Sequence, residues 1–335
     1  MRKKYNVAVM GATGAVGTSF LNILAERKFP IKNLKLLASE RSVGKKLKFN
    51  GKSYTVEKLT HNSFEGVDIV LASAGASRSL EFLPSAVKAG AVCIDNSSAF
   101  RMDKLVPLVV PEVNPEMIKA HKGIIANPNC STIQMVVALW PIHKAAKIKR
   151  IVVTTFQSVS GAGQKKINEL WEQSKVFLTN KKVKPVEFAH QIAFNLIPQI
   201  DVFLDNRYTK EEMKMVHETR KIMGDPSINV NATCIRVPVF YAHSESINIE
   251  TQKHISRAEV AKLMARAPGV KLVDDPDKQQ YPMPVDAEHQ DDTLVGRIRQ
   301  DESVANGISL WIAADNIRKG AALNAIQIAE LLIDA

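Results

Sequence analysis

The chain has 335 residues, of which 45% are hydrophobic and 24% charged. A chain this long exceeds the usual size of one hydrophobic core, so we expect two domains, and the composition excludes disordered and fibrous proteins. The formal net charge of +11 comes with only 6% aromatic residues and without a basic tract or nucleic-acid-binding motif. This pattern indicates anionic small-molecule ligands, and we expect neither nucleic acid nor a membrane as a partner.

The cysteine pattern and the first residues predict a cytoplasmic protein. Cys93, Cys130 and Cys234 are widely spaced and form no CxxC pair, which argues against disulfides and against a structural zinc site, so we expect no metal. The opening "MRKKYNVAVMGATGAVG" is interrupted by polar residues and glycines, as in a first strand and turn rather than a signal peptide. No apolar run approaches the roughly 18 residues that span a bilayer.

The first part of the chain alternates strand and helix patterns. Short β-type runs ("YNVAVM", "LKLLAS", "VDIVLAS", "AVCID", "KGIIAN") are separated by helical patterns such as "AVGTSFLNILAERK" and "SRSLEFLPSAVKAG". Strands that alternate with helices indicate βαβ units and a parallel sheet. The sequence therefore predicts a doubly wound, Rossmann-like α/β domain over residues 1–128.

The second part has longer strands and few helices. The runs "KRIVVTTFQSVS", "NATCIRVPVFYAH", "SESINIETQK", "TLVGRIRQ" and "ISLWIAAD" are typical of an α+β domain with a mostly antiparallel sheet. We assign this domain to residues 129–316. The amphipathic segment 317–335 is expected to form a helix that completes the first domain.

A glycine-rich turn suggests a dinucleotide site. "GATGAVG" places Gly11, Gly14 and Gly17 between a strand and a helix, where glycine lets the backbone approach a pyrophosphate at the helix N-terminus. The next strand ends without the acidic residue that usually binds the ribose of NAD. It is followed instead by Arg41 and Ser42, which suit a 2′-phosphate, so NADP(H) is the expected cofactor; Glu40, which would repel that phosphate, must then point to solvent.

Cys130 stands at a predicted helix N-terminus. It follows "NPN" and precedes the helical pattern "STIQMVVALWPIHKAA", and the unpaired N–H groups at such a position stabilise a thiolate. The alternative is an ordinary buried thiol, which fits Cys93 and Cys234 in their apolar strands better. We therefore predict that Cys130 is a nucleophile.

Ten motifs occur in an order and spacing that resemble the bacterial aspartate-semialdehyde dehydrogenases. The resemblance spans nearly the whole chain and rests on "GATGAVG", "SAGAS", "DNSSAFRMD", "VPEVN", "NPNCSTIQ", "SVSGAG", "FNLIPQID", "EEMKM", "RVPVFYAHSES" and "AADNIRKGAALNAIQIAE". It implies NADPH-dependent reduction of L-aspartyl-4-phosphate to L-aspartate 4-semialdehyde with release of inorganic phosphate, in lysine, threonine and methionine biosynthesis. A homodimer that associates through the sheet of the second domain is also implied.

The resemblance assigns catalytic roles. Cys130 corresponds to the nucleophile that forms a thioester, His243 to the general acid/base, and Gln157 to an amide that orients the substrate. We add Asn129, with the backbone N–H of Cys130, as a donor to the oxyanion. Because seven residues separate His243 from Arg236, they would point to opposite faces of one straight strand, so we expect a bend near residue 241.

The resemblance also assigns ligand contacts. Arg236 corresponds to the ligand of the substrate carboxylate and Glu211 to that of its ammonium group, while Arg101 and Lys214 correspond to phosphate ligands. "TKEEMK" has the pattern of a capping box between Thr209 and Glu212. The cofactor contacts expected from the glycine turn and the resemblance are Gly11, Thr13, Gly14, Ala15, Val16, Gly17, Arg41, Ser42, Ser73, Gly75, Ser160, Gly161 and Asn316.

Two alternatives remain at this stage. N-acetylglutamyl-phosphate reductases share this layout, but their substrate has an uncharged nitrogen that gives Glu211 nothing to pair with. A nucleic-acid-binding or scaffold protein that keeps only the fold is disfavoured because every expected catalytic position is occupied by a suitable residue.

Overall fold

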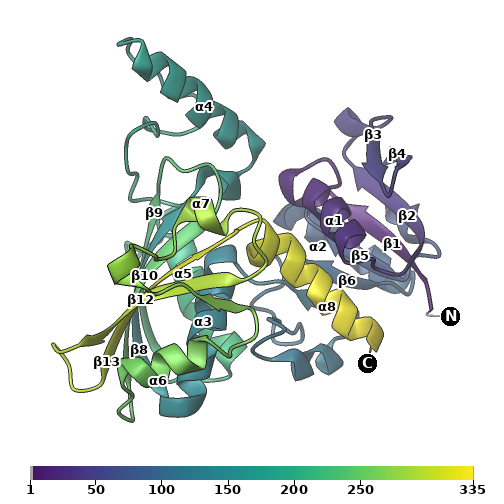
Figure 1. The fold of residues 1–335 in the computed structure, drawn as a ribbon. Helices are drawn as coiled ribbons and strands as arrows, with labels where there is room; N and C mark the ends of the chain where they lie inside the picture. The colour runs from purple at the N-terminus through teal and green to yellow at the C-terminus, as the bar shows by residue number, and fades with distance from the viewer. Residues whose placement is uncertain (1–2, 335) are drawn as a thin grey trace. The chain divides into compact units, whose positions relative to one another are not determined.

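The computed structural model describes residues 3–334 (Figure 1). Residues 1, 2 and 335, at the outer ends of the expected domains, lie outside this part. The chain divides into two compact units. Unit one contains the chain up to Asn129 and the segment from Ala321 on, and unit two contains Cys130–Gly320.

Unit one is built on a seven-stranded sheet with the order β3-β4-β2-β1-β5-β6-β7. All neighbouring strands are parallel except β3 and β4. The strands are β1 (Tyr5–Met10), β2 (Ile31–Ala38), β3 (Lys46–Phe49), β4 (Lys52–Lys58), β5 (Ile69–Ala72), β6 (Val92–Asp95) and β7 (Ile124–Ala126). Without β3, this is the strand order of a doubly wound dinucleotide-binding sheet, so the predicted fold class is confirmed.

Helices cover both faces of this sheet (Figure 1). They are α1 (Ala15–Glu26), α2 (Ala76–Lys88) and the C-terminal α8 (Leu323–Asp334). Val7 and Val9 of β1 share a core with α1 and α8, whereas Ala8 and Met10 share one with α2. The alternation of strand side chains thus places an apolar core on each face, as a parallel sheet buried on both sides requires.

The hairpin formed by β3 and β4 is absent from the sequence-based assignment. Its two-residue loop consists of Asn50 and Gly51, with φ of 47° and 75°. Asn-Gly is the preferred sequence for a two-residue hairpin turn with positive φ at both positions, so the signal was present in "FNGK" and was overlooked.

Unit two is built on a six-stranded sheet with the order β11-β12-β13-β10-β8-β9. The β12–β13, β13–β10 and β10–β8 pairs are antiparallel, and the β11–β12 and β8–β9 pairs are parallel. The strands are β8 (Ile148–Gln157), β9 (Asn229–Arg236), β10 (His243–Thr251), β11 (Val270–Leu272), β12 (Thr293–Asp301) and β13 (Gly307–Ala314). The predicted, largely antiparallel sheet is confirmed.

The helices of unit two are more numerous than the sequence suggested. They are α3 (Cys130–Ala146), α4 (Gln164–Leu178), α5 (Lys210–Met223), α6 (Arg257–Met264) and the short α7 (Pro284–Ala287). The helix α3 packs on the sheet and against α5 and α6. Its residues from Ser131 to Leu139 are all buried, because it lies between the sheet and these two helices.

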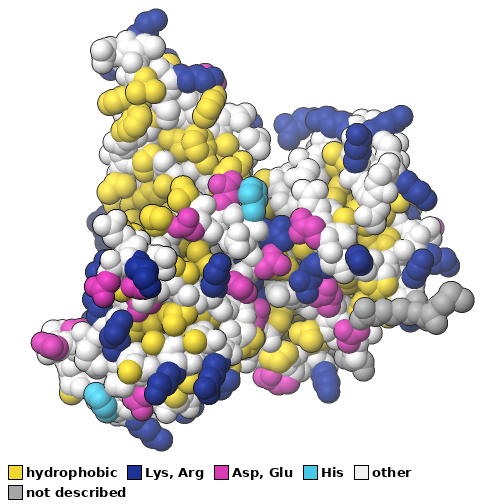
Figure 2. Space-filling model, in the orientation of Figure 1, with side chains coloured by type: hydrophobic (Ala, Val, Ile, Leu, Met, Phe, Trp, Pro, Cys, Tyr) yellow, Lys and Arg dark blue, Asp and Glu magenta, His cyan; other side chains and the backbone are white. Residues whose placement is uncertain are grey.

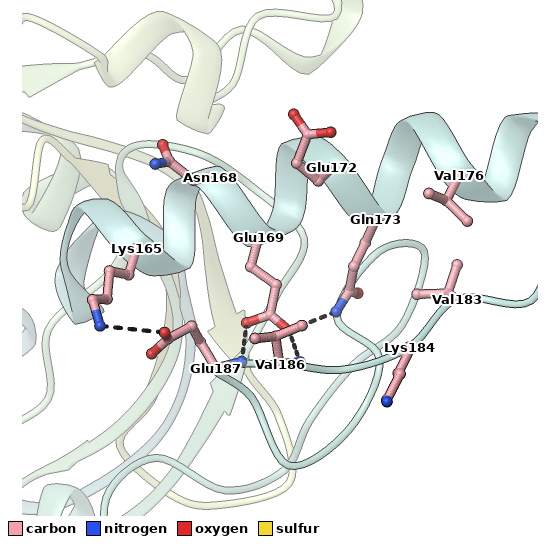
Figure 3. A pocket seen from close by; sticks show the side chains of 10 residues that line it. All are labelled: Lys165, Asn168, Glu169, Glu172, Gln173, Val176, Val183, Lys184, Val186 and Glu187. Atoms are coloured by element: carbon pink, nitrogen blue, oxygen red, sulfur yellow. Dashed lines mark hydrogen bonds and ion pairs between the residues drawn. The ribbon is translucent and has the colours of Figure 1, made fainter.

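Helix α4 and the segment after it project from the rest of unit two (Figure 1). The buried carboxylate of Glu169 accepts hydrogen bonds from the backbone N–H groups of Val186, Glu187 and Phe188, at 2.7 to 2.9 Å. Figure 3 shows Glu169 pointing from α4 toward this segment, beside Gln173. Gln173 in turn accepts from the backbone N–H groups of residues 192 and 193. Two side chains of one helix therefore hold a segment without regular secondary structure in a defined path.

Candidate active site

The glycine turn forms a close-packed cradle between β1 and α1. Gly11 has φ of 86°, and a Cβ added there would lie 2.4 Å from the backbone oxygen of Ser73. A Cβ on Gly17 would lie 2.2 Å from the backbone oxygen of Gly11. The cap residue Gly14 makes no side-chain hydrogen bond to the N–H groups of α1, which starts at Ala15. This backbone geometry fits a pyrophosphate at the N-terminus of α1. Helix α2 likewise begins after a glycine, Gly75, so no side chain caps its first N–H groups.

The end of β2 carries the residues expected near a 2′-phosphate. Arg41 and Ser42 belong to a short 3₁₀ turn, and the Ser42 hydroxyl lies 3.2 Å from that of Thr13 in the glycine turn. Glu40 points outward, with a 75% exposed side chain that forms an ion pair with Lys58 on β4. The lysine offsets the charge that would disfavour an anionic ligand at this position.

Arg101 is fixed at the carboxyl ends of β6 and β7. Its guanidinium donates from Nε to the Asn127 carbonyl, at 2.9 Å, and from a terminal nitrogen to the Asn96 carbonyl, at 2.7 Å. Its exposed fraction is 7%. Asn129, also buried, ends unit one directly before Cys130.

Cys130 is the first residue of α3, as predicted, and is partly exposed, whereas Cys93 and Cys234 are buried. Burial raises the pKa of Cys93 to about 12 and also raises the pKa of Cys234, so both stay thiols. The Cys130 side chain lies near Gly320, where an added Cβ would be 2.8 Å from the Cys130 Cβ. Any residue other than glycine at position 320 would therefore displace the Cys130 side chain.

Gln157 and Arg236 end the parallel neighbours β8 and β9 and are register partners. Both are nearly fully buried. Arg236 donates to the carbonyl of Ser158 at 2.6 Å, and burial lowers its pKa, an effect that the charges of Glu211 and Cys130 oppose. The guanidinium is therefore within electrostatic range of the Cys130 sulfur.

Glu211 connects these residues to Lys214. Its carboxylate accepts from Gln157 Nε2 at 3.1 Å and from Lys214 Nζ at 2.8 Å. Burial lowers the pKa of Lys214, but the carboxylates of Glu211 and Asp201 outweigh it and the pKa is raised overall. The predicted capping box at Thr209 and Glu212 is confirmed, and it starts α5 so that Glu211 points inward with an exposed fraction of 5%.

His243 is fully buried at the start of β10. Its Nδ1 accepts a hydrogen bond from the backbone N–H of Ser158 at 3.0 Å, so the neutral ring carries its proton on Nε2. Burial and the Arg236 charge lower its pKa to about 3. Nε2 has no hydrogen-bond partner among the described residues, and an added Cβ at Gly161 would lie 3.1 Å from it.

The chain between Arg236 and His243 is not one strand. The strand β9 ends at Arg236 and β10 begins at His243, with Pro238 between them and φ of 65° at Ala242. The expected bend is therefore present, and it breaks the continuous strand that the apolar run 231–243 had suggested. A proline without an N–H group and a left-handed residue both interrupt strand pairing.

Asn316 organises the loop around His243. Its Oδ1 accepts from the hydroxyls of Ser158 and Ser160, each at 3.1 Å, and from the backbone N–H of Ala242 at 3.0 Å. Ser160 and Gly161 lie in the short turn after β8. These expected cofactor contacts are thus also structural supports of the histidine.

Within unit two, the structure brings Cys130, Gln157, Glu211, Lys214, Arg236 and His243 to one edge of the sheet. Sequence reasoning missed Ser158, which fixes the histidine tautomer, and Asp201, which binds Lys214 at 3.0 Å. Both belong to motifs that were recognised, "SVSGAG" and "FNLIPQID", but only the fold reveals their partners. Among the described residues, no group of three or more potential ligands is arranged for a metal ion, and no helix of residues 3–334 is long and apolar enough to cross a bilayer.

Comparisons with known proteins agree with this arrangement. Residues 6–121 match the family "Semialdehyde dehydrogenase, NAD binding domain", and residues 139–319 match "Semialdehyde dehydrogenase, dimerisation domain". The chain is 59% identical to an aspartate-semialdehyde dehydrogenase of Aquifex aeolicus over 333 residues, which covers 98% of each chain.

Two solved structures add information about ligands. The chain resembles aspartate semialdehyde dehydrogenase II of Vibrio cholerae complexed with ASA, with 53% identity, a TM-score of 0.97 and coverage of 99% of both chains. It also resembles an aspartate semialdehyde dehydrogenase of Candida albicans with NADP, with 26% identity, a TM-score of 0.77 and coverage of 98% of both chains. Unit one therefore contains a domain that binds a nicotinamide dinucleotide.

Proposed function

The chain belongs to the aspartate-semialdehyde dehydrogenases and has their activity, and on this basis we propose how its own residues carry out the reaction. The overall reaction converts L-aspartyl-4-phosphate to L-aspartate 4-semialdehyde and inorganic phosphate. The proposal rests above all on one observation. His243 is a fully buried histidine whose Nε2 has no partner within residues 3–334, and the charge of Arg236 acts both on it and on Cys130. A buried donor without a partner is rare and marks a place for a ligand acceptor.

We assign the nucleophile to Cys130. Its position at the N-terminus of α3 and the charge of Arg236 favour a thiolate. The sulfur attacks the acyl carbon, a C–S bond forms, the C–O bond to phosphate breaks, and phosphate leaves. When bound, NADPH supplies the hydride that reduces the thioester to the aldehyde level. Breaking the C–S bond then releases the aldehyde and restores the thiolate.

His243 acts on the reacting oxygen. Because Nδ1 accepts from the Ser158 N–H group, Nε2–H is the group that the neutral ring presents. We infer that it donates to the oxygen that becomes negatively charged when sulfur or hydride adds to the carbonyl. A neutral imidazole with a depressed pKa is a suitable donor for such an oxyanion. Asn129 and the backbone N–H of Cys130 are further donors in this proposal.

The substrate is held by groups of opposite charge. The planar guanidinium of Arg236 suits the α-carboxylate, and the buried carboxylate of Glu211 suits the α-ammonium group. Gln157, which donates to Glu211, keeps that carboxylate in place. An uncharged acylated nitrogen could not replace the ammonium group at Glu211, which supports the free amino acid as substrate.

Phosphate binding is assigned to Lys214 and Arg101. Lys214 keeps its charge because two carboxylates contact it, and it retains an ammonium donor for an oxyanion. Arg101 donates from Nε and from a terminal nitrogen to the backbone carbonyls of Asn127 and Asn96, which fixes its guanidinium at the carboxyl ends of β6 and β7, and a guanidinium suits phosphate oxygens.

We propose NADP as the preferred cofactor. The cradle of glycines at 11, 14 and 17 suits the pyrophosphate, and Arg41 with Ser42 suits the 2′-phosphate. The outward position of Glu40 and its ion pair with Lys58 support this choice. Ser73 and Gly75 at the end of β5, with Ser160, Gly161 and Asn316 in unit two, are proposed as further contacts.

A homodimer is proposed through unit two. Exposed large hydrophobic side chains on and after α4 include Trp171 and Phe177, with exposed fractions of 54% and 44%, and Figure 2 shows hydrophobic side chains gathered over this projection. The face of the sheet opposite α3 continues this surface in our proposal. The free thiols and the need for a reduced nucleophile support a cytoplasmic location.

The proposed chemistry is tested with purified protein in the phosphate-dependent oxidative direction. We expect NADP reduction with aspartate semialdehyde and a covalent acyl adduct on Cys130 by mass spectrometry during turnover. Cys130→Ser should fold, form no adduct and lose nearly all turnover, because serine does not ionise at neutral pH. Reduction of NADP only with N-acetylglutamate semialdehyde, or near-normal turnover of Cys130→Ser, would contradict the proposal.

A further inference from the structure

Directly behind the proposed nucleophile and histidine lies a fully buried polar pair, Gln134 and Glu245. Both side chains have an exposed fraction of 0%. Gln134 Nε2 donates to Glu245 Oε1 at 2.7 Å. The pair joins α3, which begins at Cys130, to β10, which begins at His243.

The hydrogen bonding of this pair is incomplete if Glu245 is ionised. Gln134 Oε1 and Glu245 Oε2 are both buried acceptors without a partner among the described residues. Two orphaned acceptors on one pair are unusual, because buried polar atoms are nearly always satisfied. A proton on Oε2 would make this atom a donor, and we assign the amide oxygen of Gln134 as its acceptor, while the amide nitrogen donates to Oε1. Exchanging the assigned O and N atoms of Gln134 would not remove the need for this proton.

The surroundings of Glu245 disfavour a carboxylate. Across the strands stand Thr155 on β8 and Ile312 on β13, and from α3 comes the neutral Gln134. Burial raises the pKa of Glu245, and the Gln134 hydrogen bond opposes this only in part. No cation in the described part of the chain stabilises a negative charge on Glu245.

The titratable groups around Glu245 include one thiol, two carboxylates and one guanidinium. The Cys234 thiol on β9 senses Glu245, and burial raises its own pKa. From α5, Glu211 and Glu212 act on the same thiol. Lys214 pairs with Glu211, and Arg236 acts on Glu211 and on the Cys234 thiol. An ionised Glu245 would add a further negative charge, which no cation among the described residues contacts.

We propose that Glu245 is a neutral carboxylic acid that forms a two-point hydrogen-bonded pair with Gln134, and that this pair is a positioning device for the catalytic residues. Cys130 and Gln134 are four residues apart on one face of α3, and His243 and Glu245 are two apart on one face of β10. The hydrogen bonds between Gln134 and Glu245 therefore fix Cys130 and His243 relative to each other. They do so without placing a charge beside the nucleophile.

Glu245→Gln is the decisive variant, because an amide can make the same two-point pair with Gln134. We expect its kcat to stay within about threefold of the wild type. Glu245→Leu, which cannot make the pair, should lower kcat by roughly tenfold or more at little change in KM, since small displacements of reacting groups are costly. The exchanged double variant Gln134→Glu with Glu245→Gln restores one acid and one amide and should recover most of the lost activity relative to Gln134→Leu.

A pH series of thermal melts tests the protonation state without relying on activity. Above the ordinary glutamate pKa, the unfolded chain releases the proton while the folded protein keeps it, so raising the pH favours unfolding. Relative to Glu245→Gln, the wild type should lose stability from about pH 5 upward, by up to about tenfold in the unfolding equilibrium per pH unit. A difference that does not vary with pH would overturn the neutral carboxyl.

The kcat measurements depend on the proposed roles of Cys130 and His243, but the outcomes distinguish a failure of the Glu245 proposal from a failure of the proposed mechanism. A folded Glu245→Gln protein with kcat reduced a hundredfold would show that Glu245 works as a carboxylate. Wild-type kcat in Glu245→Leu would show that the tie does not position the site. If instead Cys130→Ser stays active, the proposed mechanism fails while the melts still decide the state of Glu245.

Discussion

Substituting Gly320 by alanine should lower turnover strongly while the protein stays folded. The added Cβ would lie 2.8 Å from the Cβ of Cys130 and 3.3 Å from its Cα. Carbon atoms in ordinary contact are about 3.5–4.0 Å apart, so relief requires a displacement of roughly 1 Å. Gly320 does not have positive φ, so alanine introduces no backbone strain of its own.

If Cys130 is the nucleophile, as we propose, a displacement of this size lowers the rate by about 10²-fold. We therefore expect kcat of Gly320→Ala to fall by about two orders of magnitude, and overpacking to destabilise the protein by only about 1–3 kcal/mol. The assay is saturating kcat in the oxidative direction, together with a thermal melt and the rate at which iodoacetamide alkylates Cys130. The alkylation rate should change because the helix N-terminus no longer faces the sulfur in the same way.

The control is the same substitution in a Cys130→Gly background, which lacks the Cβ that the new methyl group would meet. There, Gly320→Ala should be less destabilising than in the wild type. A folded Gly320→Ala protein with kcat within about threefold of the wild type would refute the argument that Gly320 sets the position of Cys130, the proposed nucleophile.

Three further predictions concern charge. The pKa of His243 is lowered to about 3, so below about pH 6.5 the unfolded ring binds a proton and the folded ring does not. The melting temperature of the wild type should therefore fall from pH 7 to pH 4 more steeply than that of His243→Gln. Parallel curves for the two proteins would contradict a buried neutral ring. Lys214→Met removes a charge-assisted hydrogen bond worth about 1.5–3 kcal/mol. The KM for phosphate in the oxidative assay should therefore rise about 10–100-fold, with little change in the KM for the aldehyde. An unchanged KM for phosphate would show that Lys214 does not bind phosphate. Arg41→Ala should lower kcat/KM for NADP by a similar factor and leave that for NAD nearly unchanged, and equal losses for both cofactors would mean that Arg41 does not recognise the 2′-phosphate.

Local patterns allowed much of the fold to be predicted. The alternation of strands and helices gave the doubly wound sheet, and "TKEEMK" gave the capping box of α5, because these features depend on residues close in sequence. The β3–β4 hairpin was also readable from Asn50 and Gly51. The break between β9 and β10 was harder to place, since an apolar run conceals a turn until the partner strands are known.

The sequence predicted which residues belong to the site, but not the hydrogen bonds that connect them. Cys130 at the start of α3 follows from local pattern, but the acceptor role of His243 Nδ1 depends on Ser158, which is 85 residues away in the chain. Likewise, the bond between Gln134 and Glu245 spans 111 residues. Such contacts are decided by the packing of strands and helices, and no periodicity in the sequence reports them.

The oxygen of Asn316 accepts hydrogen bonds from three donors in two segments, the hydroxyls of Ser158 and Ser160 and the backbone N–H of Ala242, which precedes His243. A single atom thus serves as the common anchor of a loop and a strand. Few substitutions of Asn316 are compatible with this arrangement. Aspartate would place a negative charge near the buried imidazole of His243, and an aliphatic residue would leave three hydrogen-bond donors without an acceptor. Engineering of cofactor or substrate range in this enzyme is therefore best directed at positions that support no such junction.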